Sequence, residues 1–467
     1  MKIKEITDST RRPQQIIDDL KRKTVIPPAW SDLVKEYDAR KHPVMTDPFY
    51  ADKPRPNGKG TEKMSRVTLD WMQLAVKRMA ALLFGIPVLR VYNDHDDDKQ
   101  KLAAQILEAV YTKNRINAVN KKRARYLYAS CEIATIWYTQ EQPTTYAGQP
   151  SDLKLRCRTF SPFSDKSKGS ENIYPLYDDY DDLIAISMEY DRTENGATVR
   201  YFETYTIDEH IRWRNTAGQP EEVLREPFDI NKLPGLYALR PEPIWEDRAS
   251  NVYEVEWNLS RNGNYIRKNS RPTWVVATDD DETNFGQEST NDNDGRNVLR
   301  YPADAKYGYA TWPQAIDSLK FHIEEIKRDF FMSLQLPDMS MDNLKATPMS
   351  GEARKMMFID AQMKAEDESD LWLELFDREA NVLKAYLKMM YPELADAFDA
   401  LEVEHRITPY QINDDGEKLS NLNTATGGKR FMSQRTAIKE AGFVDDIEAE
   451  LEQIQKEEQT DINEPSF

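Results

Sequence analysis

Cysteine is nearly absent from this sequence, since only Cys131 and Cys157 occur among 467 residues. Two cysteines cannot build the disulfide framework of a small secreted domain, and a reducing compartment suits them better. No apolar run reaches the roughly 20 residues that a membrane span needs. The segment Met1–Glu5 does not open an apolar leader. We therefore expect a protein with no membrane partner.

Positive charge is also in deficit, with 63 Lys and Arg against 81 Asp and Glu and a formal net charge of −18. Broad, tight binding to nucleic acid depends on many basic contacts with phosphate, so this balance argues against such binding. It does not exclude a protein that handles DNA without gripping it. The length allows about two to four domains and a large buried core.

Histidines are few and scattered, and none pairs with Cys or another His at the spacing of a metal site: His42, His95, His210, His322 and His405. We expect His322 to be a solvated or interface residue rather than a base. The acidic cluster Asp94–Asp98 could hold a divalent ion, but a solvated loop before a helix is the favoured interpretation.

Phosphate-binding and calcium-binding loops are missing as well. Asn57–Thr61 and Gly427–Arg430 contain Gly-Lys, but neither has the glycine and hydroxyl spacing that cradles a phosphate and magnesium. The stretch Asp279–Gly295 fails as a calcium loop because Tyr301 occupies the position that requires Glu. We predict no catalytic residue, no metal site and no cofactor.

The stretch 313–390 predicts a helix, a loop and a long second helix. Pro337 ends the first helix, and Ser350 can cap the second, which would span 351–390 with a kink or break in the polar run 366–370. Apolar residues recur at steps of three and four along the first helix: Ile316, Leu319, Ile323, Ile326 and Phe330. Little local sequence is available to bury this stripe, so neighbouring copies are plausible partners.

Elsewhere, periodicity predicts an α+β fold with a small antiparallel β domain and no internal repeat. Helices are expected at 10–23, 68–84, 99–110, 119–130, 254–269, 433–440 and 447–458. Strands are expected at 86–91, 133–139, 153–160, 183–190, 198–205, 209–214, 273–278, 297–300 and 306–310, with an extended segment at 407–413. Asn195-Gly196 is typical of a hairpin turn between two of these strands.

Several short segments follow one another in a specific order: Leu83–Pro87, Ile184–Tyr190, Val199–Tyr205, Trp245–Val252, Ser350–Ala353, Ser433–Thr436 and Asp446–Glu450. In that order they resemble the portal protein of tailed double-stranded DNA bacteriophages, in the long-tailed branch. The resemblance runs from about Val67 to Glu458. Gly263, in the first stem segment, and the lack of an obvious basic band depart from the family's pattern.

The resemblance implies a portal-like α+β subunit with long stem and wing helices, a β domain in the wing, a short-stranded clip and a helical C-terminal region. After an N-terminal polar segment (1–66), the implied parts are the wing (67–250), the first stem helix (251–270), the clip (271–312), the second stem helix (313–336), the tunnel loop (337–350), the long wing helix (351–392) and the C-terminal wing or crown region (393–458). The end, 459–467, is expected to be disordered.

The same resemblance implies three functional surfaces. The stem stripe named above would form the ring interface. The tunnel loop would face DNA through Asp338, Met339, Ser340, Met341, Asp342, Asn343, Leu344 and Lys345. The clip would dock the packaging motor and tail adaptor through Asp279, Asp280, Asp281, Glu282, Asp292 and Asp294.

The implied partners begin with the chain itself, in a ring usually of twelve copies at one capsid vertex. The others are double-stranded DNA passing non-specifically, the terminase large subunit, the head–tail adaptor, and the major capsid and scaffolding proteins. The expected location is the virion, with host cytoplasm during assembly. Two other classes stay open: a DNA-packaging enzyme such as an ATPase or nuclease, and a different structural assembly protein.

Overall fold

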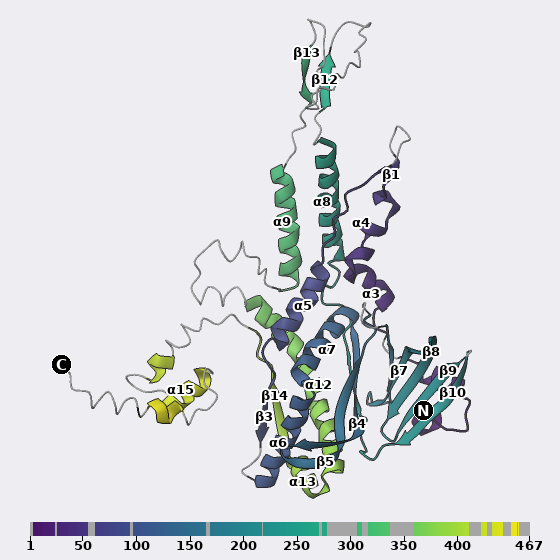
Figure 1. Cartoon of the computed structure of the whole chain (residues 1–467), viewed down its shortest axis with the longest axis vertical. Coiled ribbons are helices and arrows are strands. Elements are labelled where there is room, and N and C mark those ends of the chain that lie inside the picture. The colour runs from purple at the N-terminus through teal and green to yellow at the C-terminus, as the bar shows by residue number, and fades with distance from the viewer. Residues whose placement is uncertain are drawn as a thin grey trace, which may run out of the picture.

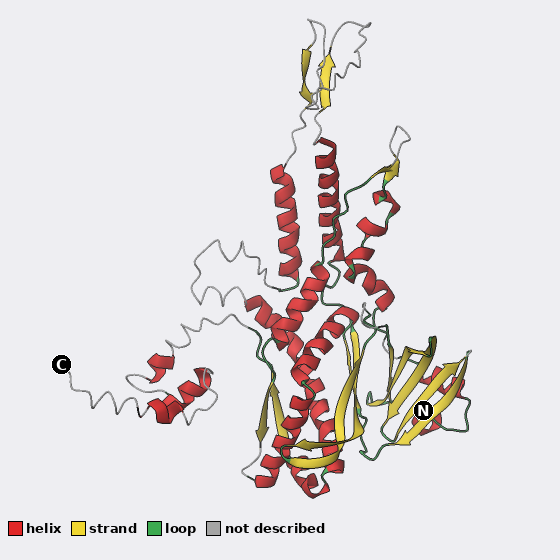
Figure 2. Ribbon diagram, in the orientation of Figure 1, coloured by secondary structure: helices red, strands yellow, loops and turns green. Residues whose placement is uncertain are grey.

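The computed structural model describes residues 3–23, 26–54, 61–93, 97–164, 169–216, 218–269, 273–277, 306–310, 316–336, 359–410, 422–426, 432–441, 450–454 and 456. Helices and small antiparallel sheets form a broad body, and two helices rise from it side by side (Figure 1). The colouring by secondary structure in Figure 2 shows the larger sheets in the body, one small sheet beside the two rising helices and another beyond their ends. The predicted α+β class is confirmed.

Short elements make up the N-terminal segment: α1 (Ile3–Ile6), α2 (Pro13–Leu20), α3 (Trp30–Tyr37), η1 (Ala39–Lys41), α4 (Pro43–Thr46), η2 (Pro48–Tyr50), β1 (Lys53–Pro54) and β2 (Thr61–Glu62). The body's helices follow: α5 (Trp71–Phe84), α6 (Asp98–Lys113), α7 (Ile116–Ser130), α12 (Ile359–Met390), η3 (Pro392–Leu394) and α13 (Ala395–Ala400). The rising pair is α8 (Ala249–Asn269) and α9 (Ile316–Ser333), and α15 (Gln434–Ala441) lies near the C-terminus.

Two antiparallel sheets pack face to face in the body. One has the order β10 (Gln219–Pro227), β9 (Glu209–Thr216), β8 (Ala197–Thr206), β7 (Leu183–Glu194) and β6 (Asn172–Tyr177). The other has the order β11 (Gly235–Leu239), β4 (Glu132–Tyr146) and β5 (Gln149–Phe160). Asn195 and Gly196 join β7 to β8 with positive φ values of 49° and 82°, as the primed hairpin turn requires.

The described residues also form three two-stranded sheets, of which one pairs β1 with β2. β14 (Glu402–Arg406) pairs with β3 (Leu89–Asn93), and β12 (Thr273–Ala277) pairs with β13 (Lys306–Ala310), both antiparallel. The predicted strand at 297–300 lies outside the described residues. The extended segment predicted at 407–413 is preceded by β14, which sequence periodicity did not reveal. Its part up to 410 has no regular structure, and the rest is outside the described residues.

The main core joins the helices of the body to the inner face of β4. At its centre Arg123 on α7 and Glu379 on α12 form a buried ion pair, with Arg123 Nη2 2.6 Å from Glu379 Oε1. The indole N–H of Trp137 on β4 donates to the same oxygen at 2.8 Å. The Glu379 carboxylate therefore joins α12 to α7 and to β4. Its hydrogen bonds are strong because the carboxylate is charged.

Of the predicted kink or break in the long helix, the break is wrong. α12 runs unbroken from Ile359 to Met390 through the polar run 366–370, and Tyr391-Pro392 ends it as expected. Glu368 within that run is buried and pairs with Arg240, whose guanidinium also lies over the Tyr128 ring. A tertiary ion pair thus holds the helix where its sequence alone favours a break.

Candidate functional site

The protruding part of the molecule is the pair α8 and α9, here called the stalk. The two helices run antiparallel side by side (Figure 1) and contact each other near the base of the stalk. Asn251 Nδ2 donates to Asp329 Oδ2 at 2.8 Å, and His322 Nε2 lies 3.6 Å from Glu254 Oε1. β12 and β13 lie beyond the ends of the stalk that point away from the body. His322 is half exposed, as a solvated or interface residue should be.

Aromatic side chains anchor the base of the stalk. Phe330 and Phe331 at the end of α9 are fully buried, and their ring centroids lie 5.5 Å and 5.9 Å from the ring of Trp71 on α5. The guanidinium of Arg78 lies 4.4 Å from the centroid of Phe331. Burial of these rings supplies a large apolar contribution that holds α9 against α5.

The predicted stem stripe divides between two surroundings. Leu319, Ile323 and Ile326 are half-buried, whereas Ile316 is 58% exposed. Phe330 is inaccessible, because it belongs to the aromatic anchor within the same chain. It is therefore not available to a neighbouring copy, which corrects the expectation for that residue. The exposed apolar side chains of α9 include two that the stripe did not contain, Phe321 and Met332.

An extended segment, Met64–Leu69, lies along α8 and is here called the strap. Its alternate amides donate to side chains that are one helical turn apart on α8. The N–H of Ser65 donates to Asn264 Oδ1 at 2.6 Å, that of Val67 to Ser260 Oγ at 2.9 Å, and that of Leu69 to Glu256 Oε1 at 2.7 Å.

The spacing of these bonds follows from element geometry. Two residues of extended chain advance about 6.6 Å, and four residues of helix advance about 6 Å. Every second amide of the strap can therefore meet a side chain at i, i+4 and i+8 of α8. The strap consequently fixes the lower half of α8 to the N-terminal segment.

Gly263 allows the strap to approach so closely. A Cβ built on Gly263 would lie 2.5 Å from Ser65 Oγ and 3.0 Å from Ser65 Cβ. Real side chains do not tolerate such contacts, so a larger residue here would displace the strap. The glycine that departs from the family's pattern is thus explained by packing, and α8 continues through it without interruption.

His42 closes the lower end of the strap. Its Nδ1 lies 2.7 Å from Glu256 Oε1 and its Nε2 lies 2.7 Å from the carbonyl oxygen of Glu36. Both ring nitrogens face acceptors, which only the doubly protonated imidazolium satisfies. Burial opposes that charge, but the hydrogen bond to Glu256 and its negative charge outweigh burial and raise the pKa of His42 above its ordinary value.

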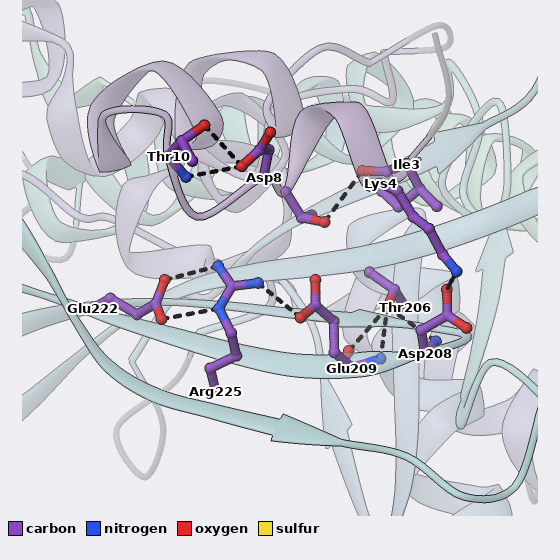
Figure 3. Close-up of polar contacts among 10 residues, drawn as sticks. Ile3, Lys4, Asp8, Thr10, Thr206, Asp208, Glu209, Glu222 and Arg225 are labelled. Carbon is purple, nitrogen blue, oxygen red and sulfur yellow. Dashed lines mark hydrogen bonds and ion pairs between the residues drawn. The ribbon is translucent and has the colours of Figure 1, made fainter.

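A second polar region lies where the N-terminus meets the five-stranded sheet (Figure 3). Lys4 Nζ is 3.3 Å from Asp208 Oδ2, and Arg225 bridges Glu209 at 2.7 Å and Glu222 at 2.8 Å. Lys4, Asp208, Glu209 and Arg225 border an open hollow of about 560 Å³ between α1 and the β8–β9 turn. These charged groups pair with one another or with Glu222, and Asp8 accepts from Thr10, so the contacts hold α1 against the sheet.

Two of the three predicted functional surfaces fall outside the described residues. These are the tunnel loop, Asp338–Lys345, and the acidic clip residues, which are Asp279, Asp280, Asp281, Glu282, Asp292 and Asp294. The Asp94–Asp98 cluster is described only from Asp97, whose side chain accepts from the Lys99 amide as a helix cap. Both cysteines are free.

Within the described ranges, no three His, Cys, Asp or Glu side chains gather in a way that could hold a metal ion. Nor does any described helix combine the length and apolar character needed to cross a membrane. The strap and its partners on α8 escaped sequence reasoning. The available signal was the row Glu256, Ser260 and Asn264 at steps of four, polar residues on the face of a helix that a neighbour covers.

Comparison with known proteins gives a family. A family model described as phage portal protein, SPP1 Gp6-like, matches residues 32–464. No curated protein matches the chain. A solved structure titled "Neck of empty GTA particle computed with C6 symmetry" is similar with a TM-score of 0.45, at 9% identity, over 91% of this chain and 96% of that one.

A second solved structure, "Virion of native gene transfer agent (GTA) particle", is similar with a TM-score of 0.38, at 11% identity, over 95% of this chain and 99% of that one. Both likenesses are distant, so the family match over most of the chain carries the assignment.

Proposed function

Since the chain belongs to the SPP1 Gp6-like family of phage portal proteins, we propose that about twelve copies close into a ring at one capsid vertex, through which double-stranded DNA is packaged and ejected. The observation that carries this proposal is the stalk. It projects from the body, it is anchored at its base by buried aromatic rings, and it exposes apolar side chains that a soluble monomer would ordinarily cover.

The charge of the chain supports passage rather than capture of DNA. Each phosphate that a protein neutralises strengthens binding and increases its salt dependence. A subunit with a net charge of −18 keeps such contacts few. Between Asp338 and Met349, the predicted tunnel loop contains one basic residue, Lys345. One copy per subunit would give a collar of flexible Met and Leu side chains with a sparse ring of weak, non-specific phosphate contacts.

Charge reversal in this loop tests the channel. Asp338→Lys with Asp342→Lys should make rings retain DNA in a salt-sensitive way, because each copy adds two positive charges to the collar. The matched control is Asp179→Lys with Asp182→Lys in the β6–β7 turn of the body, which makes the same change of net charge away from the stalk. Retention is measured by filter binding of linear duplex over a salt series.

Two outcomes decide this test. Salt-sensitive retention by the loop variant and not by the control supports a loop that faces DNA. Equal binding by wild type and loop variant at low salt would exclude that role. Lys345→Ala should leave ring assembly unchanged while altering packaging or retention, with no preference for DNA sequence.

The clip is the proposed docking site for the terminase large subunit and later for the head–tail adaptor. Its acidic run 279–295 offers little apolar surface for packing, which favours an outer rim. Deletion of 279–295 should leave rings intact and weaken the binding of motor or adaptor in a pull-down assay. Loss of the ring itself would mean that the segment is structural. The major capsid and scaffolding proteins are the proposed partners of the body, in the virion and in host cytoplasm during assembly.

A further inference from the structure

The stalk has two flanks, one on each side of α8. α8 contacts α9 on one side and α4 on the other, and Figure 1 shows α9 and α4 apart from each other with α8 between them. The same view places α9 and the α4–β1 segment over the same stretch of the stalk. Each flank therefore faces away from the other at a similar height.

Both flanks expose apolar side chains. On the α9 flank, Phe321 is 66% exposed, and Ile316 at the start of α9 is 58% exposed. On the opposite flank, here called the N-terminal flank, Phe49 in η2 is also 66% exposed, and Met45 in α4 is exposed beside it. A single exposed ring is ordinary, but exposed apolar side chains that gather on a narrow projection are typical of an interaction surface.

The charged groups nearest the two rings differ in sign. On the N-terminal flank, Lys53 Nζ lies 5.8 Å from the ring centroid of Phe49, while Asp47 caps η2 by accepting from the Phe49 amide and Asp52 pairs with Arg66. Positions 317, 321 and 324 fall on one side of α9, so exposed Asp317 and Glu324 flank Phe321. The lysine over the Phe49 ring thus carries the opposite charge to the two acids beside Phe321.

Resting on the proposed ring, we propose that the N-terminal flank of one copy (Met45, Phe49 and Lys53) receives the α9 flank of the next copy (Ile316, Phe321 and the acids beside it). A head-to-tail ring needs two different, complementary patches on each subunit. Rotation about an axis along the stalk brings the α9 flank of one copy to the N-terminal flank of its neighbour. The strap supports this contact indirectly, because its hydrogen bonds to α8 hold the N-terminal segment in place beside the stalk.

Cysteine cross-linking tests the pairing. Phe49→Cys and Phe321→Cys are introduced together into the full chain, and assembled rings are treated with a short bis-maleimide, because side chains whose rings touch can hold the two sulfur atoms beyond the reach of a disulfide. The native thiols are poor reactants at neutral pH, since burial raises the pKa of Cys131 to about 12 and that of Cys157 to about 11. The matched control pairs Phe49→Cys with Tyr180→Cys, a side chain that is 88% exposed on the body.

A ladder of covalent oligomers from the Phe49/Phe321 pair, absent from the control pair and from each single variant, is the expected result. Rings that persist in native mass spectrometry without a ladder would overturn the pairing and leave the proposed function standing. Cross-linking confined to single chains would overturn it too. Failure of the wild-type chain to form rings would instead remove the proposed function, and this inference with it.

Serine substitution gives a second, independent readout. Phe49→Ser and Phe321→Ser should each raise the concentration at which rings half-dissociate by about tenfold or more, as removal of a central aromatic contact does at interfaces. In the double variant, the rise in this concentration should be smaller than the product of the two single rises and close to one of them. The two rings make one shared contact, so either substitution already removes it. Tyr180→Ser should change the half-dissociation concentration little. Unchanged ring stability in both Phe variants would contradict the proposal.

Discussion

Replacement of Gly263 by Ala tests the packing of the strap on α8. In an ordinary helix interior this change is stabilising by about 1 kcal/mol, since glycine is a poor helix former. In this chain the added Cβ would lie 2.5 Å from Ser65 Oγ and 3.0 Å from Ser65 Cβ. Rotation of the hydroxyl removes the first contact but not the second. The strap must therefore move, and the bond from Ser65 to Asn264 weakens.

The expected magnitude follows from opposing terms. Overpacking of a close contact costs about 1–3 kcal/mol, and a weakened hydrogen bond costs about 0.5–1.5 kcal/mol. The gain of about 1 kcal/mol from better helix formation offsets part of these two costs. The net effect is a local destabilisation of about 1–3 kcal/mol. In a Ser65→Gly background the obstructing Cβ is gone. Gly263→Ala should there keep only its helix gain and stabilise α8 by up to about 1 kcal/mol.

Hydrogen exchange at the strap amides measures this directly. Each 1.4 kcal/mol of local stability corresponds to a factor of ten in equilibrium, so the amides of Val67 and Leu69 should exchange about five- to a hundredfold faster in Gly263→Ala. In the Ser65→Gly background the same substitution should leave their exchange unchanged or slower. If Gly263→Ala slows exchange at these amides in the otherwise wild-type chain, the strap does not pack against α8 as described.

Two further predictions concern buried charges. Arg123→Met leaves Glu379 buried without its cation and should lower the free energy of unfolding by about 3–5 kcal/mol in urea titration, whereas Arg123→Met with Glu379→Met should lose less than half of that; a single variant within 1 kcal/mol of wild type would contradict the buried pair. The folded-state pKa of His42 is raised, so its ion pair with Glu256 is fully stabilising below the unfolded pKa of about 6.5 and is lost as pH rises through the folded pKa. His42→Gln should remove this loss. The check is the difference in Leu69 amide protection between wild type and variant from pH 6 to pH 9. A local readout is needed because burial lowers the pKa of His405, which contributes a pH dependence of opposite sign to global stability. Equal pH dependence in the two proteins would show that His42 is not charged in the fold.

Local pattern predicted the elements whose contacts are also local. The apolar face of α5 and the Asn195-Gly196 turn placed a helix and a hairpin correctly, because periodicity and positive φ are decided by neighbours in sequence. Periodicity also predicts helices in the stretches that α8 (Ala249–Asn269) and α9 (Ile316–Ser333) occupy. The polar run 366–370 favours a kink or break in α12 when only local sequence is considered. The ion pair of Glu368 with Arg240 joins residues far apart in the chain, so local sequence does not reveal it.

Long-range contacts also explain what sequence reasoning missed at the candidate site. Nothing in the spacing of the stem stripe indicates that Phe330 packs on Trp71, a residue more than two hundred positions away. The strap is invisible for the same reason: its residues have no periodicity, and their role lies in backbone amides that any residue except proline supplies. In the sequence, only the row of polar residues on α8 and the unexpected Gly263 indicate where the strap packs.

The central claim is that this chain builds a closed ring. Native mass spectrometry of the purified full-length protein tests it most directly. The account predicts a dominant species near twelve times the 54.3 kDa of one chain, with a closed ring of a neighbouring number equally consistent with it. A stable monomer over a wide range of protein concentration and salt would contradict it.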